Sequence, residues 1–167
     1  MKEIHEQPRA VEDTLNSVLK DGAFDLSAIG LTDEEIQAAS QIYIVACGSA
    51  YHAGMVAKYV IEDLARIPVD VDLASEFRYR RPILDKNALA IIVSQSGETA
   101  DTITAVRQAK ERGAHVLAVT NREESGIVRY ADSVITLEAG VEVSVAATKS
   151  YTAQLTVFYL LALYLAQ

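Results

Sequence analysis

The six residues 94–99, Ser-Gln-Ser-Gly-Glu-Thr, concentrate groups that can bind an oxyanion. They supply three hydroxyls and one side-chain amide, and Gly97 lets the backbone turn tightly with its N–H groups pointing outward. An apolar stretch typical of a buried strand precedes them. A stretch with helical spacing follows, and the first N–H groups of a helix have no partners within the helix. Together these features predict a phosphate-binding loop that needs no Lys or Arg.

The same residues also have a purely structural interpretation. Ser and Thr are common N-cap residues, and such a run could simply end a strand and begin a helix. Neither a Gly-x-x-x-x-Gly-Lys run nor a Gly-x-Gly-x-x-Gly run after a strand is present, which disfavours ATP and dinucleotides as ligands. A phosphorylated small molecule is therefore the preferred ligand, and the structural interpretation stays open.

Two other loops are weaker candidates for contact with a small molecule. After the first predicted strand of the core, Gly48 and Ser49 can offer N–H groups and a hydroxyl to a sugar. Cys47, at the end of that strand, is more often a small buried apolar residue than a nucleophile. The small residues within 143–149 would let a ligand approach the backbone, but they could equally pack a crowded turn.

Other polar groups give no clear site. The three histidines are scattered and lack the spacing or cysteine partners of a metal site, so we expect no metal. The cluster at 78–81, Arg-Tyr-Arg-Arg, could bind an anion, but a solvated or interdomain face is the preferred interpretation. Carboxylates are plentiful, yet the sequence places no pair of them as an acid–base couple.

Strands alternate with helices along the chain, which predicts a parallel sheet with helices on both faces. We expect an α/β fold, a three-layer α/β/α sandwich with a five-stranded sheet. Alternating Asp residues suit an exposed strand at 69–73, whereas 88–93 is apolar throughout and suits burial on both faces. The predicted strands are 42–46, 69–73, 88–93, 116–119 and 134–137. The predicted helices are 8–20, 32–39, 51–66, 99–112, 125–130 and 148–166.

Composition bounds the class of protein. A chain of 167 residues that is 50% apolar and 23% charged suits one globular domain that buries its own core. The net charge of −8 argues against a duplex nucleic-acid binder. A single cysteine excludes an internal disulfide and suits a reducing cytoplasm. The apolar stretch 155–166 is too short to cross a membrane. Because it is apolar almost all round, we expect it either to pack against a partner or, as the preferred interpretation, to belong to a chain cut from a longer one.

At its loops the chain resembles the first sugar-isomerase (SIS) domain of the glutamine–fructose-6-phosphate aminotransferase family, also called glucosamine-6-phosphate synthases. The matching runs cover essentially the whole chain, at residues 2–8, 46–49, 74–80, 94–102 and 145–149. The resemblance implies one flavodoxin-like SIS domain over residues 1–167, with an N-terminal helical segment at 1–40 and an α/β core at 41–167. In the family, a glutaminase releases ammonia, and two SIS domains aminate and isomerise fructose 6-phosphate to glucosamine 6-phosphate.

The resemblance also implies residue roles. The residues that it implies for the sugar phosphate are Ser94, Gln95, Ser96 and Thr99. The residues that it implies for the lining of the sugar pocket are Cys47, Gly48, Ser49 and Val145. Ala50 and Ala147 stand where a serine is frequent in the family, so no hydroxyl contact is expected there. The family's catalytic carboxylate and Lys come from the second SIS domain, and its ring-opening His comes from a neighbouring subunit. None has a match here, so we assign this chain no catalytic residue and no cofactor.

Two functional hypotheses follow. The chain is the fructose 6-phosphate-binding part of such an aminotransferase, unable to turn over alone, or it is a stand-alone regulatory module that senses a sugar phosphate. The expected partners are fructose 6-phosphate or glucosamine 6-phosphate, the missing glutaminase and second SIS domains, and a second copy in a homodimer. Neither nucleic acid nor a membrane is expected as a partner.

Overall fold

Five parallel strands form the central sheet in a computed structural model that describes all 167 residues except the side chains of Leu26 and Ala28. Their order in the sheet is β4-β3-β5-β6-β7. This is the flavodoxin-like order, in which the chain starts in the middle and crosses over to build both sides. Each predicted strand is confirmed to within one residue at each end. The strands are β3 (Gln41–Ala46), β4 (Val69–Leu73), β5 (Ala88–Ser94), β6 (His115–Thr120) and β7 (Ser133–Thr136).

The position of each strand in the sheet accounts for its sequence. Every residue of β5 is buried, because β5 lies between β3 and β6 and is covered on both faces. β4 pairs only with β3 and is an edge strand. An edge strand can leave polar side chains near solvent, and Asp72 on β4 accepts a hydrogen bond of 2.8 Å from the exposed Arg80. The predicted contrast between an exposed strand and a buried one is confirmed.

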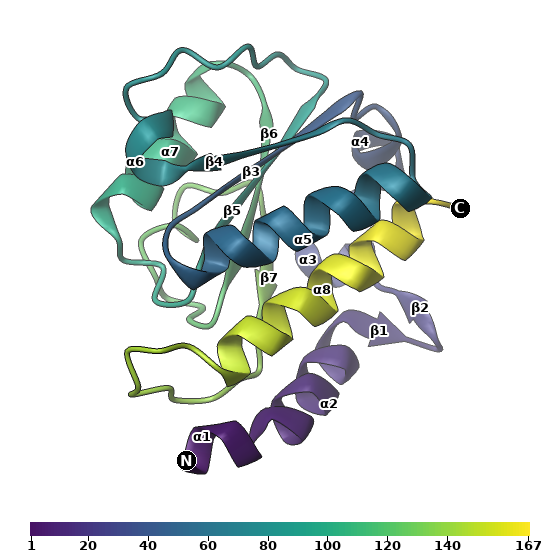
Figure 1. Ribbon diagram of the computed structural model, residues 1–167. Coiled ribbons are helices and arrows are strands. Elements are labelled where there is room, and N and C mark those ends of the chain that lie inside the picture. Colours follow the sequence, from purple (N-terminus) through teal and green to yellow (C-terminus); the bar gives the residue numbers. More distant parts are fainter.

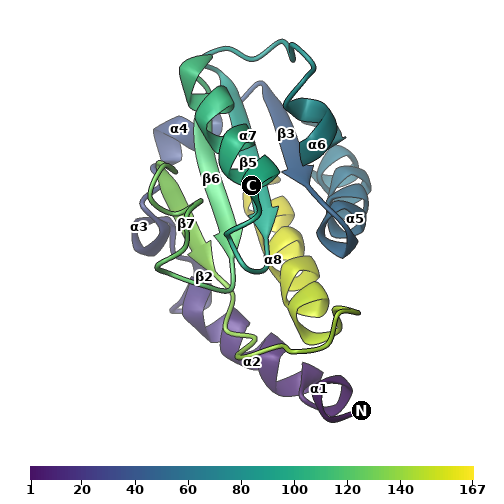
Figure 2. The same ribbon diagram turned by 90° about the vertical axis from the view of Figure 1, so that its left-hand side faces the viewer.

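Helices cover both faces of the sheet, as Figures 1 and 2 show. Side chains alternate along β5, so Ile91 and Val93 join the core on one face while Ala90 and Ile92 join the core on the other. The predicted three-layer sandwich is thereby confirmed. The first face carries α2 (Gln7–Val18), α5 (Ser49–Leu64) and α8 (Lys149–Leu165), and the second carries α6 (Ala74–Phe77) and α7 (Ala100–Glu111).

Helix α8 lies between α2 and α5, and Figure 1 shows the three helices side by side. Val157, Phe158 and Leu161 are fully buried there. Packing within the chain therefore accounts for most of this helix's apolar circumference, and only Tyr159 and Leu163 stay exposed among its large apolar residues. None of the helices in the described part of the chain is long and apolar enough to cross a membrane.

The N-terminal segment is helical apart from a small hairpin. The helix predicted at 8–20 ends at Val18, because Asp21 and Gly22 adopt positive φ angles of 53° and 80° and turn the chain into two short antiparallel strands. The capping box predicted at Thr32 is confirmed, with Glu35 N donating to Thr32 Oγ1 at 3.2 Å. The elements here are α1 (Lys2–His5), α2, β1 (Leu19–Lys20), β2 (Ala23–Phe24), α3 (Leu26–Ile29) and α4 (Asp33–Gln37).

The short helix predicted at 125–130 is wrong, because residues 121–131 form a series of turns and bends. Two of their N–H groups bond to the loop at 94–99. Ile127 N donates to the carbonyl oxygen of Gly97 at 3.0 Å, and Gly126 N donates to a carboxylate oxygen of Glu98 at 2.8 Å. Other N–H groups make turn bonds within the segment, such as Ala131 N to Ile127 O at 3.1 Å, but these do not continue into a helix.

Candidate functional site

The strand order brings two of the predicted loops to one place. β3 and β5 are neighbours, and the helices that follow them, α5 and α7, cover opposite faces of the sheet. The two connections therefore diverge at the carboxyl ends of these strands and leave a crevice, where open α/β sheets bind ligands. Residues 47–48 and 95–99 leave the sheet on either side of this point.

The loop after β5 is ordered by its own hydroxyls. The Oγ of buried Ser94 accepts a hydrogen bond of 3.1 Å from Gly97 N, and Ser96 Oγ accepts one of 3.3 Å from Glu98 N. Two of the amides expected to point outward are thus used inside the loop. Among the described residues, the N–H groups of Ser96 and Thr99 and those of the first turn of α7 have no acceptor. These groups remain available to an anion.

Thr99 is the N-cap residue of α7 but makes no capping hydrogen bond through its side chain. It is exposed, as is Glu98, whereas Gln95 and Ser96 are half-buried. A hydroxyl at an N-cap normally satisfies one free amide of the helix. At α7 the Thr99 hydroxyl and the helix amides are both left for another partner.

Gly97 is required by both its conformation and its neighbours. Its φ is +66°, and a Cβ at this position would lie 2.1 Å from Ser125 Oγ and 2.4 Å from Ser125 Cβ. Segment 121–131 therefore packs directly behind the loop. The bond from Gly126 N to Glu98 also directs that carboxylate toward the same segment. Sequence reasoning missed this support, because nothing near residue 97 indicates which distant residues pack against it.

The loop after β3 is also open. Gly48 is the N-cap of α5, with φ 60° and ψ −136°, and as a glycine it has no side chain that could cap the helix. Gly48 and Ser49 are exposed, and Ala50 is buried. Cys47 is half-buried and packs against the core on the α7 side of the sheet. This placement agrees with the interpretation of Cys47 as a small apolar residue.

The third candidate loop differs, because a carboxylate of the chain fills the amino terminus of α8. Glu142 Oε1 accepts hydrogen bonds from Thr148 N at 2.8 Å and from Lys149 N at 3.0 Å, and Ser150 Oγ donates to Glu142 Oε2. Burial alone would raise the pKa of Glu142, but the hydrogen bonds from Ser150 and from the helix amides outweigh it and hold the pKa below its ordinary value of 4.5. The anion position at this helix end is already occupied.

Val145 lies in the same segment as Glu142 and is fully exposed. Among the described residues no hydrogen bond joins it to the loops at 47–49 or 94–99. Val145 belongs to the connection that leaves the carboxyl end of β7 and leads to α8. The structure therefore groups seven of the eight predicted residues at the switch point and places Val145 on a separate loop of the same edge.

The basic cluster at 78–81 is an exposed, ion-paired surface. Arg78 lies 3.4 Å from Asp101 in the first turn of α7, and Arg80 lies 2.8 Å from Asp72. Tyr79 is exposed. These contacts agree with the preferred solvated face. They also partly neutralise a carboxylate close to the loop at 94–99.

A hollow of about 690 Å³ lies at the opposite edge of the sheet, next to the first residues of β5 and β6. None of the eight predicted site residues lines it. His115 faces this hollow and has a structural role: its ring nitrogens lie 3.4 Å from Glu35 Oε1 and 2.7 Å from Ser133 Oγ. We therefore do not place the site there.

Comparison with known proteins identifies the family. The sequence profile of the SIS domain matches residues 35–164. The chain belongs to the SIS domain family. This SIS domain is 55% identical to the glutamine–fructose-6-phosphate aminotransferase (isomerizing) of Clostridium tetani, over 100% of its own length and 28% of that protein. It is 52% identical to the protein of the same name from Mycolicibacterium paratuberculosis, of which it covers 27%.

Solved structures agree with this assignment. The C-terminal domain of the glucosamine-fructose-6-phosphate aminotransferase from Francisella tularensis is 40% identical, with a TM-score of 0.92, and the match covers 99% of the SIS domain and 47% of that chain. The sugar isomerase domain of an RpiR transcription factor from Sphaerobacter thermophilus has a TM-score of 0.74 at 21% identity, which shows the shared fold alone. The SIS domain thus spans about a quarter of the length of the curated aminotransferases that it matches.

Proposed function

We propose that this SIS domain binds fructose 6-phosphate as part of the isomerising half of a glutamine–fructose-6-phosphate aminotransferase. The main support is the open amino terminus of α7, which presents free N–H groups and hydroxyls at the switch point of the sheet. The 55% identity to an aminotransferase of that name, over the whole chain, supports the same substrate. Because the net charge is −8, the local donors must overcome a repulsive field.

The hydrogen bonds inside the loop favour donation to a phosphate. Ser94 and Ser96 each accept an amide hydrogen bond, so the hydrogen of each hydroxyl is free to donate outward. Thr99 adds a hydroxyl that makes no capping hydrogen bond within the described part of the chain, and Gln95 adds a side-chain amide. Cys47, Gly48, Ser49 and Val145 complete the proposed sugar contacts.

We assign this chain a binding role without catalysis. A phosphate is remote from the carbons that react when a ketose is isomerised, so holding it contributes by positioning those carbons for catalytic groups elsewhere. In the proposal, these groups come from a second SIS domain and a neighbouring subunit, and a glutaminase domain supplies ammonia. The product, glucosamine 6-phosphate, keeps the same phosphate and uses the same loop. We place the protein in the cytoplasm.

A regulatory role without chemistry is less well supported. The transcription factor with a sugar isomerase domain is only 21% identical. The aminotransferases are 52% and 55% identical over the full length of the chain. The aminotransferase proposal is therefore preferred over a sugar-phosphate sensor.

Titration calorimetry with fructose 6-phosphate tests the proposal. Thr99→Val removes a donor to a charged group and should weaken binding by about 1.5–3 kcal/mol, roughly 10- to 150-fold. Thr104→Val is the matched control, because Thr104 lies on the same helix and donates to Ala100 O, away from the loop. Equal affinity of the wild-type chain and Thr99→Val would contradict the site. Glucose 6-phosphate in parallel titrations measures selectivity for the ketose.

We also propose that two copies form a homodimer through apolar residues exposed on α5 and α8, which pack side by side. Four large ones are Tyr59, Leu64, Tyr159 and Leu163. Sedimentation equilibrium should show a concentration-dependent dimer. A monomer at the highest concentration reached would contradict this part of the proposal.

A further inference from the structure

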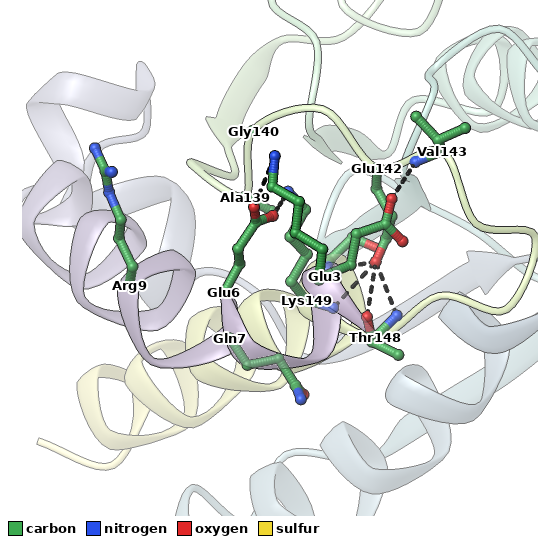
Figure 3. A network of polar contacts seen from close by, with 12 residues as sticks. Glu3, Glu6, Gln7, Arg9, Ala139, Gly140, Glu142, Val143, Thr148 and Lys149 are labelled. Atoms are coloured by element: carbon green, nitrogen blue, oxygen red, sulfur yellow. Dashed lines mark hydrogen bonds and ion pairs between the residues drawn. The ribbon is translucent and has the colours of Figure 1, made fainter.

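Carboxylates from the far end of the sequence hold the segment that contains Val145. Residues 138–148 form neither helix nor strand. Glu3, on α1, accepts a hydrogen bond of 2.6 Å from Val143 N through Oε1, and the same oxygen lies 3.3 Å from Ser144 N. Figure 3 shows Glu3 reaching from the N-terminal helix to this backbone. The two amides lie one and two residues before Val145.

An ion pair between a buried lysine and a partly exposed glutamate makes a second tie between the same parts of the chain. Lys149 Nζ lies 2.7 Å from Glu6 Oε2, and the Lys149 side chain is only 5% exposed. A buried ammonium group requires such a partner, because its desolvation is otherwise uncompensated. The hydrogen bond from Lys149 lowers the pKa of Glu6 below its ordinary value, against the opposing effect of desolvation. Glu6 and Lys149 face each other in Figure 3.

Helix α1 has little packing of its own. It has four residues and buries none of them, and so short a helix is not stable alone in water. Glu6 joins it directly to α2, and Gln7 Nε2 donates to Ile4 O at 2.9 Å. The bonds to Glu3 add a tie from α1 to the segment near Val145.

We infer that Glu3 and Glu6 are positioning residues that fix residues 141–147 in the sugar-binding conformation and so couple helix α1 to the sugar pocket. This inference rests on the proposed function, in which Val145 contacts the sugar. Ordering one backbone residue costs about 1–2 kcal/mol, and a segment ordered before binding does not subtract that cost from affinity. Displacement of α1 would then weaken the sugar contact while the phosphate loop, which neither carboxylate contacts, stays intact.

Amide hydrogen exchange tests the ordering directly, without a ligand. In Glu3→Ala, exchange at Val143 and Ser144 should become about tenfold faster or more, as expected for loss of a hydrogen bond to a charged group. Glu12→Ala is the matched control, since Glu12 lies on the neighbouring helix α2, exposed to solvent. Glu3→Gln keeps one oxygen acceptor and should restore most of the protection. Unchanged exchange at both amides in Glu3→Ala overturns the inference.

Calorimetry with two ligands then separates positioning from general destabilisation. Glycerol 3-phosphate offers the same phosphate on a three-carbon chain and lacks the rest of the six-carbon sugar, which in the proposal contacts Val145. Glu3→Ala and Glu6→Gln should each weaken fructose 6-phosphate binding by about threefold to tenfold and leave glycerol 3-phosphate binding unchanged. An equal loss for both ligands, or no loss for either, overturns the positioning role.

The outcome for the wild-type chain distinguishes the two proposals. If it binds both ligands and Glu3→Ala behaves identically to it, only the positioning inference fails. If the wild-type chain binds neither ligand, the proposed function fails, and the positioning role fails with it whatever the exchange rates show.

Discussion

The amino termini of α7 and α8 look alike in sequence but differ in what occupies them. Both helices follow strands of the same sheet, and each is preceded by small and hydroxyl-bearing residues. At α8, Glu142 accepts bonds from two backbone amides and from the Ser150 hydroxyl. At α7, the N-cap Thr99 makes no capping bond through its side chain, and the first-turn amides have no acceptor among the described residues.

The difference shows how one chain builds a structural helix end and a binding one. The amino terminus of a helix carries a partial positive charge that favours an anion, whether this is a side chain or a ligand. Glu142 meets that preference at α8. Glu98 precedes α7 closely enough to do the same, but it bonds to Gly126 N instead. The loop after β5 therefore keeps its donors for a ligand because its nearest acidic residue is engaged elsewhere.

We expect the largest loss of stability from a variant that puts a side chain between the loop at 94–99 and the segment at 121–131. Gly97→Ala places a methyl group 2.1 Å from Ser125 Oγ in a backbone with φ +66°, so strain and overpacking add. Unfolding in urea should show a loss of about 2–5 kcal/mol in the free energy of unfolding. Binding of fructose 6-phosphate should be lost with it.

Gly22→Ala provides a matched control, because Gly22 has φ +80° but nothing within 4 Å of an added Cβ. It should lose only the conformational part, about 1–2 kcal/mol. Adding Ser125→Gly to Gly97→Ala should recover part of the larger loss. If the two alanine variants lose equal stability, Ser125 does not determine the shape of the loop, and the contrast between the helix ends loses its structural basis.

The next effect in size tests the filled terminus. Glu142→Gln leaves one oxygen to accept from the α8 amides and puts an NH₂ group near them, so stability at pH 7 should fall by about 1–2 kcal/mol. Because the pKa of Glu142 is lowered in the folded chain, its contribution is complete above its ordinary value of 4.5 and is lost as pH falls through the lowered pKa. Urea titrations should therefore show a gap between wild type and variant that narrows below about pH 4.5.

Glu138→Gln is the control for that experiment. Glu138 is exposed in the same segment, and its side chain makes no hydrogen bond or ion pair among the described residues. Its change in stability should stay within about 0.5 kcal/mol at every pH. A gap for Glu142→Gln that is as large at pH 3 as at pH 7 would show that the charge of this carboxylate is not what holds the helix end.

The sequence allowed the sheet to be predicted because each strand is a local pattern. The run at 88–93 is apolar on both faces, and the Asp residues at 69–73 mark an edge strand. The loop at 94–99 was found for the same reason, since its hydroxyls and glycine are contiguous. Local patterns of this kind need no knowledge of distant residues.

Contacts between distant residues could not be predicted in this way. Glu3 bonds to an amide 140 positions away, and Glu98 bonds to one 28 positions away. In the helix predicted at 125–130, such bonds take the N–H groups of Gly126 and Ile127, and the segment forms turns instead. The open end of α7 depends on such a contact, because Glu98 bonds to Gly126 N. At α8 the contact is local, since Glu142 lies six and seven positions before the amides from which it accepts, but no pattern in the sequence shows that the chain turns Glu142 onto them.

The smallest effect concerns the residue just before the filled terminus. Ala147 is half-buried beside the Thr148 and Lys149 amides, and Glu142 already accepts hydrogen bonds from both, so the new hydroxyl in Ala147→Ser does not replace a missing partner there. Stability should change by less than about 0.5 kcal/mol. Affinity for fructose 6-phosphate should stay within about threefold or improve, because a hydroxyl near the sugar adds a donor without removing one. Titration calorimetry of Ala147→Ser and Thr99→Val under the same conditions compares the two affinities directly. If Ala147→Ser loses as much affinity as Thr99→Val, the end of α8 that Glu142 fills contacts the ligand as closely as the open end of α7. The comparison would then be wrong, because both helix ends would bind the ligand.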